Sequence, residues 1–176
     1  MLVFTAGVAQ AGIITFQPQW QDASALNLGN SGWSFDTEVP YWAVVEEYVA
    51  PGSDTVALGA SGTTDSDPSL HISKTITNNS TFVWTDYHIV ISGQGVSYVS
   101  GSASSDKFGT IVEGVNSIDF YAPQLVPIGQ SVTVAFDVQI PEGMFSFGID
   151  QTPTPEPATL GMLAMGGLAL IRRKRL

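Results

Sequence analysis

The sequence predicts an all-β protein, an antiparallel β-sandwich of the Ig-like or jelly-roll-like kind. Apolar and polar side chains alternate over several short segments, and turns rich in Gly, Ser and Thr separate these segments. No stretch before residue 158 has a helical period, whereas a parallel sheet would need crossover helices. We therefore expect one sandwich domain over residues 12–150, then a short linker over 151–157 and a single C-terminal hydrophobic helix within 158–176.

Residues 1–11 predict a truncated signal peptide. They are apolar and close with Ala9-Gln10-Ala11, the small-x-small pattern at which signal peptides are cleaved. Ala9 and Ala11 are therefore the predicted cleavage residues, and Gly12 the mature N-terminus. No basic residue precedes the apolar stretch, so we expect the true start of the chain to lie upstream. A buried first strand is the alternative.

Two neighbouring segments predict a hairpin. Apolar side chains alternate with polar ones over residues 70–77, and Asn78-Asn79-Ser80 then turns the chain into a second strand over 82–91. Both faces of the second strand carry large apolar side chains, so we expect it at the centre of a sheet. Asn78 and Asn79 also match the N-x-Ser/Thr glycosylation pattern, which a tight turn explains sufficiently.

The remaining predicted strands are separated by turns. Candidate segments are 41–48, 96–100 and 117–122. The clearest strand is 131–140, which has turn-forming Pro and Gly residues on both sides. Its apolar face consists of Val132, Val134, Phe136, Val138 and Ile140.

The charge of the body argues against nucleic acid as a partner. All sixteen acidic residues lie between residues 12 and 157, where Lys74 and Lys107 are the only cations, so this stretch carries a net charge of −14. Phosphate backbones would be repelled, whereas cations would be attracted. The chain has no cysteine, which excludes a disulfide scaffold, a thiolate metal site and a cysteine nucleophile.

Few residues of the body suggest catalysis. His71 and His88 are the only histidines, and neither has the i, i+4 partner of a helical zinc motif, so a structural or surface role is favoured. No Gly-x-Ser-x-Gly elbow is present, and no Ser/His/Asp triad can be assembled. Glu46 and Glu47 are adjacent on a predicted strand and should face opposite ways. We expect a protein that is not an enzyme and that has no cofactor.

Two further features of the body are candidates for ligand binding. Asp65 and Asp67 lie in a predicted surface loop and are candidate Ca²⁺ ligands, although the loop lacks EF-hand spacing and a solvated Asx turn is favoured. Exposed aromatic faces would suit stacking against sugars, although we expect most of them in the core. The aromatic candidates are Trp20, Trp33, Tyr41, Trp42 and Trp84.

The C-terminal segment combines three features in a fixed order. Thr152-Pro-Thr-Pro-Glu-Pro157 precedes an uncharged apolar run over 158–171, and a basic cluster follows. A helix rising ~1.5 Å per residue over this run would be short for a hydrocarbon core of ~30 Å. By the positive-inside rule the basic cluster stays in the cytoplasm, so the body faces out. The cluster consists of Arg172, Arg173, Lys174 and Arg175.

Together, Pro155-Glu156-Pro157, the apolar run and the basic cluster resemble the PEP-CTERM sorting signal. The resemblance is confined mainly to residues 153–176. It implies recognition and processing by exosortase, a membrane-embedded, transpeptidase-like enzyme of Gram-negative bacteria that make extracellular polysaccharide. Pro155, Glu156 and Pro157 are then recognition residues for that enzyme and carry no catalysis of their own. A plain C-terminal membrane anchor is the alternative.

The resemblance implies a membrane-anchored precursor, held by its C-terminal helix until processing, and a product at the cell surface or outside the cell. We therefore expect an exported, non-enzymatic surface or matrix protein of a polysaccharide-rich biofilm, with exosortase as its processing partner and extracellular polysaccharide as a further partner. The alternatives are a secreted hydrolase and a carbohydrate-binding module that carry the same signal. A concave pocket with converging Asp, Glu or His side chains would favour the hydrolase.

Overall fold

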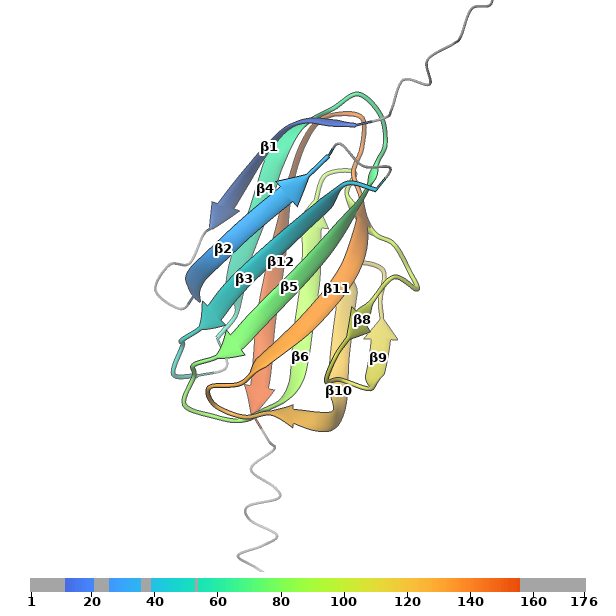
Figure 1. Ribbon diagram of the computed structural model, residues 1–176. Coiled ribbons are helices and arrows are strands. Elements are labelled where there is room, and N and C mark those ends of the chain that lie inside the picture. The colour runs from blue at the N-terminus through green and yellow to red at the C-terminus, as the bar shows by residue number, and fades with distance from the viewer. Residues whose placement is uncertain (1–11, 21–25, 36–38, 53, 156–176) are drawn as a thin grey trace, which may run out of the picture.

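The computed structural model describes residues 12–20, 26–35, 39–52 and 54–155, which form two β-sheets packed face to face (Figure 1). The described residues contain strands and turns without any helix, so the all-β prediction is confirmed for this part of the chain. The predicted helix within 158–176 and the predicted signal peptide over 1–11 lie outside the described residues.

Sheet A has six strands in the order β1-β4-β12-β6-β10-β9, and all its neighbouring strands are antiparallel. Its two central strands, β12 and β6, therefore lie between β4 on one side and β10 on the other. The strands of sheet A are β1 (Ile13–Trp20), β4 (Val56–Thr64), β12 (Gly143–Pro155), β6 (Trp84–Gly93), β10 (Ser117–Val126) and β9 (Thr110–Glu113).

Sheet B follows the order β2-β3-β5-β11-β7, and β8 also pairs with β11. Most pairs are antiparallel as predicted, but β3 and β5 are parallel neighbours, which the sequence pattern did not predict. The strands of sheet B are β2 (Leu26–Ser34), β3 (Tyr41–Tyr48), β5 (Ser69–Asn78), β11 (Ser131–Gln139), β7 (Ser97–Tyr98) and β8 (Ser104–Ser105).

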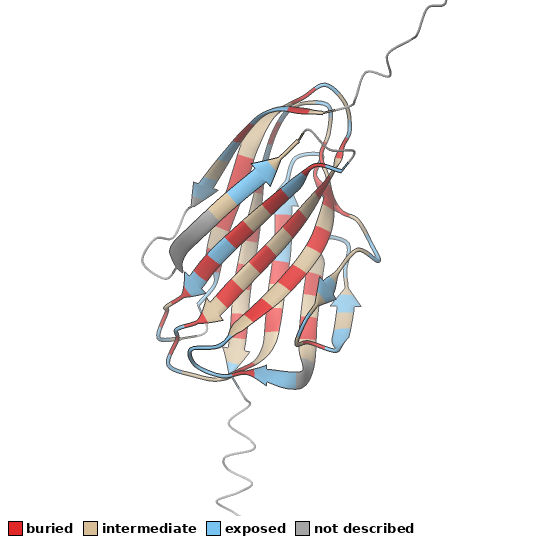
Figure 2. Ribbon diagram, in the orientation of Figure 1, coloured by how far each residue is buried: buried red, intermediate tan, exposed pale blue. Residues whose placement is uncertain are grey.

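The core lies between the two sheets, and buried positions alternate with more exposed ones along the central strands (Figure 2). All five side chains of the predicted apolar face over 131–140 are fully buried. The strand over 41–48 has the predicted bounds, and Glu46 is buried while Glu47 is exposed, as the alternation predicts. The candidate over 96–100 is reduced to the short strand β7.

The predicted hairpin over 70–91 is wrong. Both strands exist, but β5 belongs to sheet B and β6 to sheet A, so the turn between them carries the chain from one sheet to the other. Asn78 holds this crossing: its fully buried amide group donates to the carbonyls of Phe82 at 2.9 Å and Val126 at 2.8 Å. Its Oδ1 accepts from the backbone N–H and the hydroxyl of Ser80. An Asn with its amide satisfied inside the fold is not presented to a glycosylating enzyme.

The central position predicted for the strand over 82–91 is confirmed, because β6 pairs with β12 and β10. The regular alternation of its side chains between two faces is interrupted at one point. Trp84 and Tyr87 are both fully buried, although their spacing would place them on opposite faces of a regular strand. A register shift near Trp84, where Pro155 pairs with it, accounts for the change of phase.

The predicted linker over 151–157 is also wrong over most of its length. Residues 151–155 continue β12 and pair with β6, ending at Pro155 opposite Trp84. Proline is unfavourable inside a sheet because it cannot donate a backbone hydrogen bond. Here β12 pairs with β4 only as far as Gln151. Beyond that residue, the side of β12 that faced β4 no longer needs backbone hydrogen-bond donors.

A close approach of three strands explains a glycine in β4. Gly62 pairs with Phe16 of β1 on one side and with Phe145 of β12 on the other. A Cβ atom at this position would lie 1.9 Å from the backbone oxygen of Thr15 and 2.8 Å from the Phe145 ring. Only glycine fits this position without moving its neighbours.

Candidate functional site

The first residues of the Thr-Pro segment are part of the folded sheet. The hydroxyl of Thr85 lies 3.3 Å from the backbone carbonyls of both Thr154 and Pro155, and the Thr154 hydroxyl donates to Asp86 Oδ2 at 3.3 Å. Pro153 is buried, whereas Pro155 is exposed at the end of the sheet. The sheet therefore extends to the residue that precedes Glu156.

The other residues predicted to act in sorting lie outside the described residues. These are Glu156, Pro157, the basic residues Arg172, Arg173, Lys174 and Arg175, and the cleavage residues Ala9 and Ala11. Within the described ranges, no helix has the length and apolar character needed to cross a membrane.

A buried ion pair lies inside the core, where the sequence analysis predicted none. Lys74 of β5 and Glu46 of β3 are both fully buried, and Lys74 Nζ lies 2.7 Å from Glu46 Oε1. Apart from this contact, neither Lys74 Nζ nor the two Glu46 oxygens have a hydrogen-bond partner among the described residues. Burial lowers the pKa of Lys74, and the neighbouring Glu46 only partly opposes this effect.

Two polar side chains of sheet A face the same region. The hydroxyl of Tyr87 on β6 donates to Gln151 Oε1 on β12 at 2.5 Å, and both residues are fully buried. Gln151 Nε2 is buried and has no hydrogen-bond partner within the part of the chain that the structure describes. Burial raises the pKa of Tyr87 well above its ordinary value, and the charge of Glu46 raises it further. Glu46 thus lies close enough to influence the Tyr87 hydroxyl, and we call Glu46, Lys74, Tyr87 and Gln151 the core polar cluster.

Each histidine is paired with an aspartate from the neighbouring strand. His71 Nδ1 lies 2.6 Å from Asp137 Oδ1 across β5 and β11, and His88 Nδ1 lies 2.7 Å from Asp119 Oδ1 across β6 and β10. These pairs were not predicted, because each aspartate is distant in the chain from its histidine. All four residues are only partly buried and point away from the core. They fit cross-strand surface pairs.

The loop carboxylates proposed as Ca²⁺ ligands make hydrogen bonds to the backbone instead. Asp65 Oδ1 accepts from the N–H of Gly12 at 2.7 Å, and Asp67 Oδ1 accepts from the N–H of Glu142 at 2.5 Å. Ser66 also donates to Asp65. Among the described residues, no three His, Asp or Glu side chains are grouped so that they could hold a metal ion.

The aromatic candidates do not form one exposed platform. Trp42 and Trp84 are fully buried, while Trp33 is 45% and Tyr41 42% exposed. Trp33 pairs with Trp42 across β2 and β3 and contacts the Phe16 ring at 5.7 Å between centroids, so it lies at the open edge of the core. Tyr41 precedes Trp42 on β3 and therefore points to the outer face. The side chain of Trp20 lies outside the described residues.

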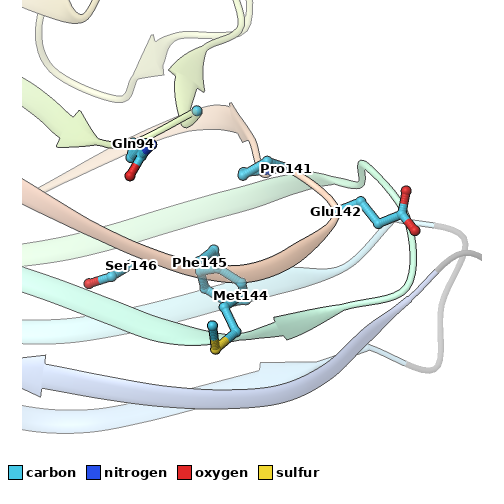
Figure 3. Close-up of a pocket in the computed structure, with 7 residues that line it drawn as sticks. Gln94, Pro141, Glu142, Met144, Phe145 and Ser146 are labelled. Atoms are coloured by element: carbon cyan, nitrogen blue, oxygen red, sulfur yellow. The ribbon is translucent and has the colours of Figure 1, made fainter.

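The surface depressions bring few titratable groups together. Figure 3 shows one of about 580 Å³, in which Glu142 is the only titratable residue among the described lining residues. Its carboxylate points away from the other labelled side chains. A second depression of about 360 Å³ has Asp150 as its only titratable lining residue. A third, of about 330 Å³, is lined by Phe82, Val83, Leu125 and Pro155. Among the described lining residues, none of the three depressions has a histidine, a lysine or a second carboxylate.

Comparison with known proteins identifies the C-terminal segment. Residues 153–175 match the family model of the PEP-CTERM protein-sorting motif, so the chain carries this signal at the predicted place. The signal indicates exosortase-dependent export and sorting to the cell surface. No curated protein and no solved structure matched the chain.

Proposed function

We propose that this chain is a non-enzymatic protein of the cell surface or extracellular matrix, which exosortase processes at its PEP-CTERM signal. The observation that carries the proposal is the direct junction between signal and fold: the matched residues begin at 153, inside β12. A folded sandwich thus adjoins the recognition residues without a long flexible segment, which suits a domain delivered as cargo.

The chemistry of the body supports a binding or structural role over a hydrolase. The three depressions described above each contain one titratable lining residue or none. The two His–Asp pairs lie on the outer faces of different sheets, so they do not combine into one site. The acidic body favours solubility in a hydrated matrix and attracts cations. A carbohydrate-binding module is the second candidate, favoured by the half-exposed ring of Trp33.

The test is the intact mass of the exported product in hosts with and without exosortase. With the enzyme present, we expect a product that lacks the apolar run and basic cluster. Without the enzyme, the tail through Leu176 should remain attached. Glu156→Ala should impair processing while leaving the unfolding midpoint unchanged, because Glu156 follows the last described residue of the sheet.

Glu142→Ala is the matched control, since it removes an exposed glutamate from the opposite end of β12. It should be processed like the parent chain. A tail retained equally in both hosts would leave the plain membrane anchor as the correct interpretation. A large loss of stability in Glu156→Ala would instead place that glutamate within the folded domain.

A further inference from the structure

We propose that Lys74 and Gln151 become joined by an intramolecular amide bond that links the two sheets through the core. In this reaction Glu46 carries the proton and Tyr87 polarises the amide that is attacked. The proposal concerns the folded body and does not depend on how the chain is sorted.

One ring contact across the core and the hydrogen bond between Tyr87 and Gln151 indicate that the four residues of the core polar cluster lie at about the same level of the sandwich. Trp42 of β3 contacts Phe147 of β12 across the core, with ring centroids 6.3 Å apart. Glu46 follows Trp42 along β3 by the same number of residues as Gln151 follows Phe147 along β12. Glu46 and Gln151 therefore lie at about the same level of the sandwich. Since Lys74 Nζ lies 2.7 Å from Glu46, the amine belongs to this level as well.

Lys74 has the properties of an activated nucleophile. Its side chain is fully buried, and desolvation lowers the pKa of the amine, which favours the neutral form that attacks carbonyl carbons. Glu46 is the only acidic side chain that the structure pairs with it, at a distance suited to proton transfer. Lysines activated by burial in an apolar pocket are established nucleophiles in other proteins.

Gln151 has the properties of the electrophile. The Tyr87 hydroxyl donates to its Oε1 at 2.5 Å, and this contact would stabilise the negative charge that develops on the oxygen during attack. The pKa of Tyr87 is raised, so the phenol remains protonated and keeps its role as a donor. The Nε2 group, which would leave, is buried, and no described residue forms a hydrogen bond with it.

The reaction balances without an added reagent. The neutral Lys74 amine attacks Gln151 Cδ, a bond forms between Nζ and Cδ, and the bond between Cδ and Nε2 breaks. Before the attack, the Lys74 ammonium passes one proton to Glu46, so that both groups are neutral. Glu46 then donates its proton to Nε2, which leaves as ammonia, and takes a second proton from Nζ. Neither oxidation nor reduction occurs, and Glu46 ends as a neutral carboxylic acid, so the reaction leaves no unpaired charge in the core.

The product would remove two unfavourable features of the core. A buried ion pair is costly to desolvate, and so is a buried donor without a hydrogen-bond partner. After reaction, the Lys74 charge and the orphan Nε2 group are both replaced by one secondary amide. Its single N–H is left beside Glu46, which is free to accept it.

Intact mass of the purified full-length chain tests the proposal directly. We expect the folded protein to be lighter than its sequence by one ammonia. Trypsin gives a second measurement, because Lys74 and Lys107 are the only cleavage sites between residues 12 and 171. Since trypsin does not cut after an acylated lysine, residues 75–107 should not be released, and the peptide containing Lys74 should remain attached to the peptide containing Gln151.

Variants separate this reaction from other losses of ammonia. Lys74→Met and Gln151→Leu should each abolish the mass change, whereas the matched control Lys107→Met should retain it. Glu46→Gln keeps the volume of the side chain and should slow the loss of ammonia at least tenfold. An unchanged mass in the folded parent chain, after prolonged incubation as well as directly after purification, would overturn the proposal. So would a mass change that persists in Lys74→Met.

Discussion

Glu113 ties a turn of sheet B to the edge of sheet A. Its carboxylate accepts hydrogen bonds from the Tyr98 hydroxyl at 2.5 Å, the Ser100 hydroxyl at 2.8 Å and the N–H of Gly101 at 2.8 Å. Three donors around one carboxylate favour its charged form. The Tyr98 contact contributes most to lowering the pKa of Glu113, followed by the Gly101 and Ser100 contacts.

This lowered pKa predicts how acid affects the fold. A carboxyl group whose pKa is lower in the folded than in the unfolded state contributes stability above the unfolded value of about 4.3. That contribution is lost as the pH falls through the lowered folded value. The melting temperature of Glu113→Gln should therefore lie below that of the parent chain at neutral pH, and the difference should shrink on acidification.

Melting temperatures measured from neutral to acidic pH test this prediction. Glu142→Gln is the control, because it removes the same charge without these three contacts. The melting temperature of Glu142→Gln should differ little from that of the parent chain at every pH. A Glu113→Gln difference that stays constant or grows towards low pH would contradict the assignment of these contacts to the charged form.

The core polar cluster could have been predicted from the sequence in part. Lys74 falls on the same face of its strand as Leu70, Ile72 and Ile76, and Glu46 shares a face with Trp42, Val44 and Tyr48. A charge within an apolar alternation is therefore the signal for a buried ion pair. The partners of each charge could not be predicted, because they come from strands whose pairing the local pattern does not specify.

At the level of the strand, adding a single methyl group at Gly62 of β4 should destabilise the fold strongly. Gly62→Ala should lower the free energy of unfolding by about 1–3 kcal/mol or more, because the added methyl group overlaps the backbone of β1. Gly32→Ala in β2 is the matched control, since a Cβ there meets nothing within 4 Å.

Urea denaturation of the two variants measures this effect. Gly32→Ala should stay within about 0.5 kcal/mol of the parent chain. Equal stabilities of the two alanine variants would show that β1 moves aside without cost, contrary to the close approach of β1, β4 and β12.

The positions of the strands in the sequence were easier to predict than the way the strands pair. The segments over 41–48 and 131–140 alternate strictly, and both were found with nearly the predicted bounds. β4 was not predicted, because its glycines and small side chains interrupt the alternation that marks a strand. The failed hairpin before β6 shows a further limit: a turn motif has the same local sequence whether it joins neighbours or crosses between sheets.

At the scale of the whole molecule, the end of β12 belongs to the fold and to the sorting signal at once. A chain truncated after Asp150 should lose at least about 3 kcal/mol of stability, because it lacks the buried residues Gln151 and Pro153 and their pairing with β6. A chain truncated after Glu156 keeps all of β12 and should unfold at the same urea concentration as the full chain.

The comparison of the two truncated chains by urea denaturation distinguishes a strand from a linker. Equal free energies of unfolding would show that residues 151–155 behave as a linker, as the prolines predicted. The signal itself was recognisable because its three features follow one another in the chain, whereas the surface and core of the body are assembled from distant strands. The sorting signal could therefore be identified from the sequence, whereas the contacts within the body required the fold.

The central place of β12 also has a consequence for timing. A chain is delivered from its N-terminus, so β12 arrives after every other described strand. Until then β4 and β6 have no common neighbour, and sheet A exists as two separate pieces, β1-β4 and β6-β10-β9. The sandwich closes only when the residues next to the sorting signal emerge. The body thus completes its fold at nearly the same time as the sorting signal becomes available for recognition.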